Sequence, residues 1–201
     1  TKIKSWRRRD VIKDYRFYII SLNMLAMPWL ATGIFVYQSF ISESKMWDVY
    51  TIPKAFMVYS ITSIITLFMS GFLVDKFTGR KLILYMNLPL LLAMFTLFQF
   101  KHEISAYFFL GFIGISNGLA NILGSSTWAE IYGVKYIGSI KALTTAFMVF
   151  STAFGTAVFG LLIDNGFTIE NIAFVGGAYI IISLILLIMF RKTIEPVRLS
   201  N

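Results

Sequence analysis

The charged residues with the most suggestive spacing lie in one short segment between two apolar stretches. That segment holds Gly71, Asp75, Lys76, Gly79, Arg80 and Lys81, and Glu130 follows a later apolar stretch. Arg80 and Lys81 lie just past the turn at Thr78 and Gly79, so they can reach Asp75 as ion-pair partners. Asp75 would also oppose the helix dipole at a carboxyl terminus, which requires a compensating cation or helix amino terminus nearby. The alternative is a basic loop in which Asp75 is incidental.

A second group of polar residues interrupts apolar sequence at helical spacing. Gly114, Asn117, Asn121, Gly124 and Trp128 share one stripe of an expected helix. Amides in hydrocarbon require partners, so Asn117 and Asn121 should face protein or a water-filled cavity, as interhelical packing groups or as solute contacts. Asn23, Tyr37 and Gln38 share a face of the first apolar run, which Pro28 is expected to kink. They are further candidates for a substrate path.

Few residues suited to enzyme chemistry are present. The chain has no Cys and a single His, His102, which lies beside Glu103 in an expected connector. This composition excludes Cys-ligated metals and disulfides, and paired intramembrane His or carboxylates are absent. We therefore expect no metal, no cofactor and no enzyme activity. A channel with Asn-Pro-capped re-entrant helices is disfavoured because no Asn-Pro dipeptide occurs.

Six long runs free of Asp, Glu, Lys and Arg organise the chain. They cover residues 17–42, 55–74, 82–100, 104–129, 142–163 and 171–190. About 20 apolar residues cross a bilayer as a helix, so each run is long enough. The composition agrees, with 57% apolar and 14% charged residues among 201. The runs predict an all-α membrane protein with a bundle over residues 17–190, a basic segment over 1–16 and a tail over 191–201.

The basic residues are distributed unevenly between the two sides of this bundle. With alternating spans, 15 of the 18 Lys and Arg residues fall on the side of the amino terminus. Cytoplasmic loops are enriched in Lys and Arg, so both termini are expected in the cytoplasm, with the plasma (inner) membrane as the location. The net charge of +8 is thereby explained by topology and anionic lipid, and no nucleic-acid partner is expected.

An internal repeat relates the two halves of the bundle. Gly71 to Asp75 and Gly160 to Asp164 both read Gly-x-Leu-(Val/Ile)-Asp, and they are offset by 89 residues. The same offset places the first three runs on the last three, as repeats over 17–100 and 104–190. Three spans is an odd number, so the two copies have opposite orientations. Inverted three-helix repeats are typical of secondary transporters.

The segment from Gly71 to Lys81 resembles the signature cytoplasmic loop of the major facilitator superfamily, with Thr78 in place of the commoner glycine. The stretch from Trp128 to Lys141 resembles the loop between helices 10 and 11 of branches similar to monocarboxylate and oxalate/formate carriers. The resemblance covers essentially the whole chain, as helices 7–12. It implies that Asp75 caps a neighbouring helix, with the start of the fifth span near Ser139 as the capped end, and that Arg80 pairs with Glu130. The loop and Glu130 would then form a conformational latch that holds in one state of the protein and breaks in the other.

This resemblance implies the carboxyl-terminal half of a secondary carrier that moves a small solute by alternating access. Its partners would be the solute, with or without a co-transported ion, the lipid bilayer, and an amino-terminal six-helix half or a second copy. The chain begins at Thr1 rather than Met, so a fragment, a split subunit and a homodimerising unit are all considered. A non-transporting or degenerate membrane scaffold is the main alternative function.

Overall fold

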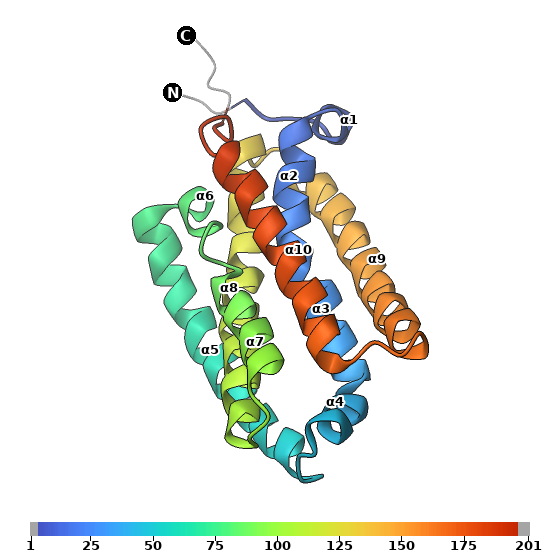
Figure 1. The fold of residues 1–201 in the computed structure, drawn as a ribbon. Helices are drawn as coiled ribbons and strands as arrows, with labels where there is room; N and C mark the ends of the chain where they lie inside the picture. The colour runs from blue at the N-terminus through green and yellow to red at the C-terminus, as the bar shows by residue number, and fades with distance from the viewer. Residues whose placement is uncertain (1–3, 197–201) are drawn as a thin grey trace.

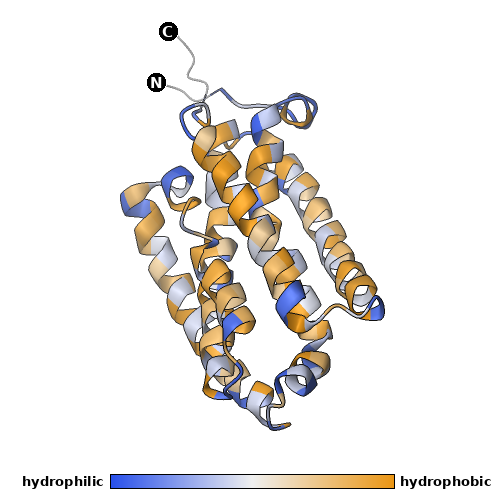
Figure 2. Cartoon of the chain, in the orientation of Figure 1, coloured by the Kyte–Doolittle hydropathy of each residue, from blue (hydrophilic) through white to orange (hydrophobic). Residues whose placement is uncertain are grey.

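The computed structural model describes residues 4–196. It is an all-helical bundle whose polar residues gather at its two ends, with apolar residues along the helix surfaces (Figures 1 and 2). The first and last described residues and the predicted cytoplasmic loops lie at one end of the bundle, which we call the terminal end (Figure 1). The ten helices of the described part are α1 (Arg8–Ile12), α2 (Tyr15–Met24), α3 (Ala26–Val36), α4 (Gln38–Lys45), α5 (Thr51–Phe77), α6 (Gly79–Leu82), α7 (Leu88–Gln99), α8 (Ile104–Tyr132), α9 (Ile137–Asp164) and α10 (Ile169–Met189).

Five segments are long and apolar enough to cross a membrane. They are α2 with α3, α5, α8, α9 and α10. The third predicted run, 82–100, is not one helix: residues 83–87 form turns, and α7 has only 12 residues. Pro89 in the first turn of α7 explains the break, because proline lacks an N–H and clashes with the carbonyl four residues earlier. A continuous sixth span is therefore not observed.

The first span is broken near Leu25, as Pro28 predicts. Proline leaves the carbonyl four residues before it without its helical partner. Side chains from three other segments bind carbonyls around this break. Tyr179 Oη donates to Leu22 O (2.7 Å), Asn87 Nδ2 to Asn23 O (2.6 Å) and Ser151 Oγ to Leu25 O (3.2 Å). The kink is thus stabilised by α10, by the turn before α7 and by α9.

The helix contacts follow the predicted repeat. α5 packs along α8 as α9 packs along α3, α7 contacts α8 as α10 contacts α2, and α7 and α10 contact each other. Two close helix contacts are related by the same offset: a Cβ added at Gly155 would meet the backbone of Trp29, and one added at Gly118 would meet Thr66. Adding 89 to Trp29 and Thr66 gives Gly118 and Gly155. Equivalent pairs therefore form equivalent interfaces in the two repeats.

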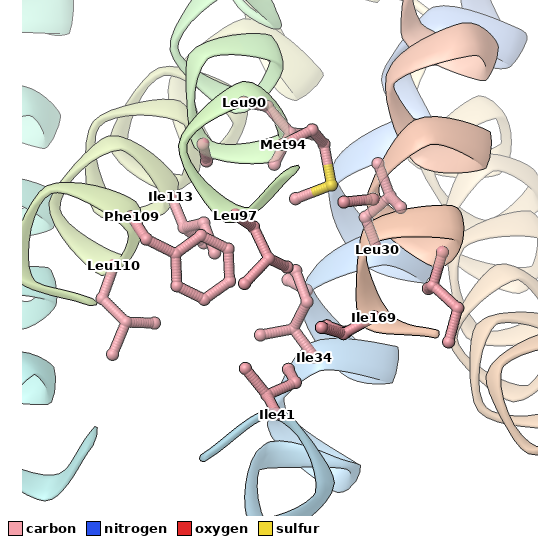
Figure 3. Packing of buried hydrophobic residues seen from close by; sticks show 14 of the residues in the cluster. Leu30, Ile34, Ile41, Leu90, Met94, Leu97, Phe109, Leu110, Ile113 and Ile169 are labelled. Atoms are coloured by element: carbon pink, nitrogen blue, oxygen red, sulfur yellow. The ribbon is translucent and has the colours of Figure 1, made fainter. Parts of the chain in front are cut away.

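The main hydrophobic core lies where the two repeats meet. Leu30 and Ile34 of α3 pack there with Met94 and Leu97 of α7 and Phe109 of α8 (Figure 3). All five side chains are buried. By contrast, only 6% of an 18-residue apolar stretch of α5 and 17% of such a stretch of α9 is buried, against 50% for α8. α5 and α9 are consequently the helices that present most of their surface to lipid or to another protein.

Candidate functional site

A cleft of about 490 Å³ opens between α2, α3, α8 and α9. Its wall is mainly apolar and includes four methionines, whose flexible thioethers adapt to differently shaped ligands. The polar side chains that line it are Ser21, Thr32, Tyr59, Asn117, Asn121, Ser125, Lys141, Thr144, Thr145 and Thr152. An apolar wall with a few orienting polar groups is the usual composition of a small-molecule site.

Two of the amides predicted for the substrate path line this cleft. Asn117 Nδ2 donates to Ser63 Oγ of α5 (2.9 Å), so Asn117 joins two helices as well as lining the cavity. Asn121 Nδ2 donates to Asn117 O (2.9 Å), and Asn121 is exposed. Its amide oxygen accepts no hydrogen bond within the described residues, which leaves Asn121 the better placed of the two to contact a ligand.

The three path candidates of the first span lie elsewhere. Asn23 is fully buried and does not line the cleft; its backbone carbonyl accepts a hydrogen bond from Asn87 Nδ2. Tyr37 stacks on Phe159 of α9, with ring centroids 6.2 Å apart, and Gln38 is exposed at the start of α4. They share a helical face in the sequence, but the breaks at Leu25 and Tyr37 separate them in space.

The residues of α9 that line the cleft were missed by the sequence analysis. Lys141, Thr145, Met148 and Thr152 recur every three to four residues, which places them on one face. This stripe of hydroxyl-bearing residues on one face of the helix is the sequence pattern that could have identified them. Lys141 is the charged residue of the cleft wall, and it lies in the first turns of α9 at the terminal end.

Glu130 of α8 forms a clasp with the first two residues of α6. Its carboxylate accepts hydrogen bonds from Gly79 N (2.6 Å) and Arg80 N (3.1 Å), and Arg80 Nε lies 3.7 Å from Glu130 Oε2. Gly79 is required here because a Cβ would lie 2.6 Å from Ser126 Oγ and 3.1 Å from Thr127 N. The sequence thus placed Arg80 and Glu130 correctly as neighbours, and the two backbone amides are an additional component.

Asp75 does not join this clasp. Asp75, Lys76 and Lys81 are exposed, and Asp75 makes no hydrogen bond or ion pair with any residue of 4–196. α5 and α9 lie on opposite sides of the bundle (Figure 1), so Asp75 does not cap the start of α9 near Ser139. The implied cap is absent from this arrangement because α8 and the first span stand between the two helices. Gly71 has open space around it.

Within residues 4–196 no group of three or more His, Asp or Glu side chains could hold a metal ion. The arrangement instead offers a ligand cleft at the side of the bundle and an ion-paired clasp at the terminal end.

The sequence profile of the Major Facilitator Superfamily matches residues 18–201. No curated protein matches the sequence significantly.

Proposed function

The chain belongs to the major facilitator superfamily, a family of secondary transporters of small solutes that are integral multi-pass membrane proteins, and from this premise we propose how it works. The chain acts as the carboxyl-terminal six-helix half of a carrier that moves a solute by alternating access, with the solute bound in the cleft between α2, α3, α8 and α9. The cleft is the observation that supports this most directly. Its volume of about 490 Å³ suits a small solute, and its apolar wall carries the amides of Asn117 and Asn121.

The proposed partner is a second six-helix half that covers the cleft. α5 and α9 have the least buried surface of the long helices, and α9 also lines the cleft. A partner that packs against α9 would therefore cover the cleft as well. A six-helix unit alone would leave the cleft open at the side of the bundle, and carriers of this kind rock two halves about a midplane site. The plasma membrane, with both termini in the cytoplasm, remains the proposed location.

Replacement of Asn121 by leucine should lower solute uptake about tenfold or more. The change removes a polar group that faces the cleft, and one hydrogen bond of ~1.4 kcal/mol corresponds to a tenfold effect. Gln38→Leu is the matched control, because Gln38 is exposed and lies away from the cleft. Vesicles containing each variant would be incubated with a mixture of small metabolites, and uptake would be read by mass spectrometry. Equal uptake by both variants would exclude Asn121 from the solute path.

Asp75 is proposed to be the switching part of the latch. An unpartnered carboxylate at the carboxyl end of α5 is unfavourable against the helix dipole, so a helix amino terminus of the partner half would stabilise it in one conformation. Asp75→Asn should therefore reduce uptake about fivefold or more, the size of a modest coupling energy, while membrane insertion is unchanged.

Asp164→Asn is the control for Asp75→Asn, because Asp164 is also exposed and ends the equivalent helix of the other repeat. Uptake would be normalised to the amount of protein in the membrane. Uptake by Asp75→Asn at the rate of the unmodified protein would reject the latch.

A further inference from the structure

Two arginines that are distant in sequence bind three consecutive carbonyls of the tail. Arg16 Nη1 donates to Glu195 O (2.7 Å) and Thr193 O (3.4 Å), and Arg80 Nη1 donates to Ile194 O (3.4 Å). These carbonyls lie in the segment that follows the carboxyl terminus of α10, beyond its cap residue Phe190. The tail between Thr193 and Glu195 therefore joins the start of the first span to α6.

Each of these arginines is also paired with a carboxylate that is fastened to the end of α8. Arg80 pairs with Glu130, and Arg16 pairs with Asp14 (2.7 Å). Asp14 in turn accepts a hydrogen bond from Tyr132 Oη (3.2 Å). A guanidinium has five N–H donors, so it can serve a carboxylate and backbone carbonyls together.

The result is a closed ring of polar contacts that begins and ends on α8. It runs from Tyr132 through Asp14 and Arg16 to the tail, and from the tail through Arg80 to Glu130. Tyr132 and Glu130 are two residues apart on α8.

The tail is also anchored by an apolar contact inside this ring. Ile194 is 5% exposed and belongs to the buried cluster at the terminal end, which includes Ile83, Trp128 and Leu187. Burial of apolar surface away from water is favourable, so this contact stabilises the tail against the bundle. The tail is therefore held by packing as well as by hydrogen bonds.

We propose that residues Thr193–Glu195 are a positioning element: they hold Arg80 against Glu130 and fix the terminal end of this half as one rigid body. Arg80 and Glu130 then stay together through the transport cycle, and the contacts that break lie between the two halves. Only this last consequence depends on the proposed function, because the ring itself lies within the chain.

The test uses distances between labels at the terminal end. The chain has no cysteine, so Lys81→Cys and Lys135→Cys introduce two unique spin-label sites, both at exposed residues beside the clasp. The distances would be measured by pulsed electron spin resonance in lipid nanodiscs without any solute. Truncation after Lys192 should broaden the distance distribution. Truncation after Pro196 is the matched control and should leave it narrow. Identical distributions for the two truncations would overturn the proposal.

A second test compares how much Arg80→Gln lowers the melting temperature in the full chain and in the truncated chain. Loss of packing alone would leave these two shifts equal. If the tail acts through Arg80, Arg80→Gln should lower the melting temperature of the full chain but cause less than half that shift after truncation at Lys192. Equal shifts in both backgrounds would show that the tail does not position Arg80. Either failure would leave the transport proposal intact, since no solute is involved.

A third variant applies if the truncated chain does not insert. Arg80→Lys retains a charge for Glu130 but lacks the second donor arm that reaches Ile194 O. A spin label at Pro196→Cys should then become more mobile than in the Arg80 protein. An unchanged line shape would contradict the proposal.

Discussion

Gly118→Leu, like the equivalent Gly155→Leu, is expected to disrupt the bundle more than any other substitution considered. A Cβ at Gly118 would lie 2.7 Å from Ser63 O and 2.8 Å from Leu67 N, which are backbone atoms of α5. Backbone cannot swing aside as a flexible side chain does, so α5 and α8 would have to separate. Overpacking of a tight contact costs about 1–3 kcal/mol or more, and small residues are what allow membrane helices to approach closely. We expect a loss of about 3 kcal/mol, measured as a lower melting temperature in detergent.

Gly124→Leu is the control for this prediction because it makes the same change on the same helix. A Cβ at Gly124 meets no atom within 4 Å, so the melting temperature should hardly change. Gly124 lines the cleft, however, so this variant should lose uptake while it remains folded. The opposite ranking of the two melting temperatures would show that the α5–α8 interface does not depend on Gly118.

Gly155→Leu tests whether the two repeats are mechanically equivalent. Gly155 faces the backbone of Trp29 across the α3–α9 interface, which corresponds to the Gly118 contact under the 89-residue offset. A destabilisation similar to that of Gly118→Leu is expected.

Glu130→Ala is expected to produce the second largest effect. It removes the acceptor of two backbone N–H groups and the partner of Arg80 in one step. Hydrogen bonds to a charged group contribute about 1.5–3 kcal/mol, and the partial exposure of this site reduces the ion-pair contribution. We expect a loss of about 2–3 kcal/mol for alanine and about half of that for Glu130→Gln, which retains one acceptor oxygen.

Glu43→Gln is the matched control for Glu130→Gln. Glu43 is exposed, and its carboxylate makes no hydrogen bond within residues 4–196. Melting temperatures would be compared in the same detergent, and uptake would be measured in vesicles. Equal melting temperatures for the two glutamine variants would mean that the clasp contributes nothing to stability.

Sequence patterns predicted the spanning helices well because hydrocarbon imposes one simple requirement. A segment that crosses lipid must satisfy its own backbone and carry few charges, so α5, α8, α9 and α10 coincide with charge-free runs. The third run, 82–100, shows where this reasoning fails. Its composition satisfied the hydropathy criterion, but Pro89 set the start of α7 and left residues 83–87 as turns.

The site was only partly predictable for a related reason. Asn117 and Asn121 were found because both lie on one unbroken helix, α8, where helical spacing determines which residues share a face. Asn23, Tyr37 and Gln38 were grouped by the same rule, which fails across the breaks at Leu25 and Tyr37. Helical spacing predicts which residues share a face only within one unbroken helix.

The sequence by itself determined the membrane-spanning class, the superfamily, the repeat and the pairing of Arg80 with Glu130, because each of these depends on local composition or on a motif. The tertiary structure alone decided which helices enclose the cleft, that Lys141 and the threonines of α9 line it, and that Arg16 and Arg80 meet on the tail. These contacts join residues of different helices, and some are far apart in the sequence: Arg80 and Ile194 are 114 positions apart. Only the packing of helices against one another brings such residues together, and a local sequence pattern does not show which helices will pack.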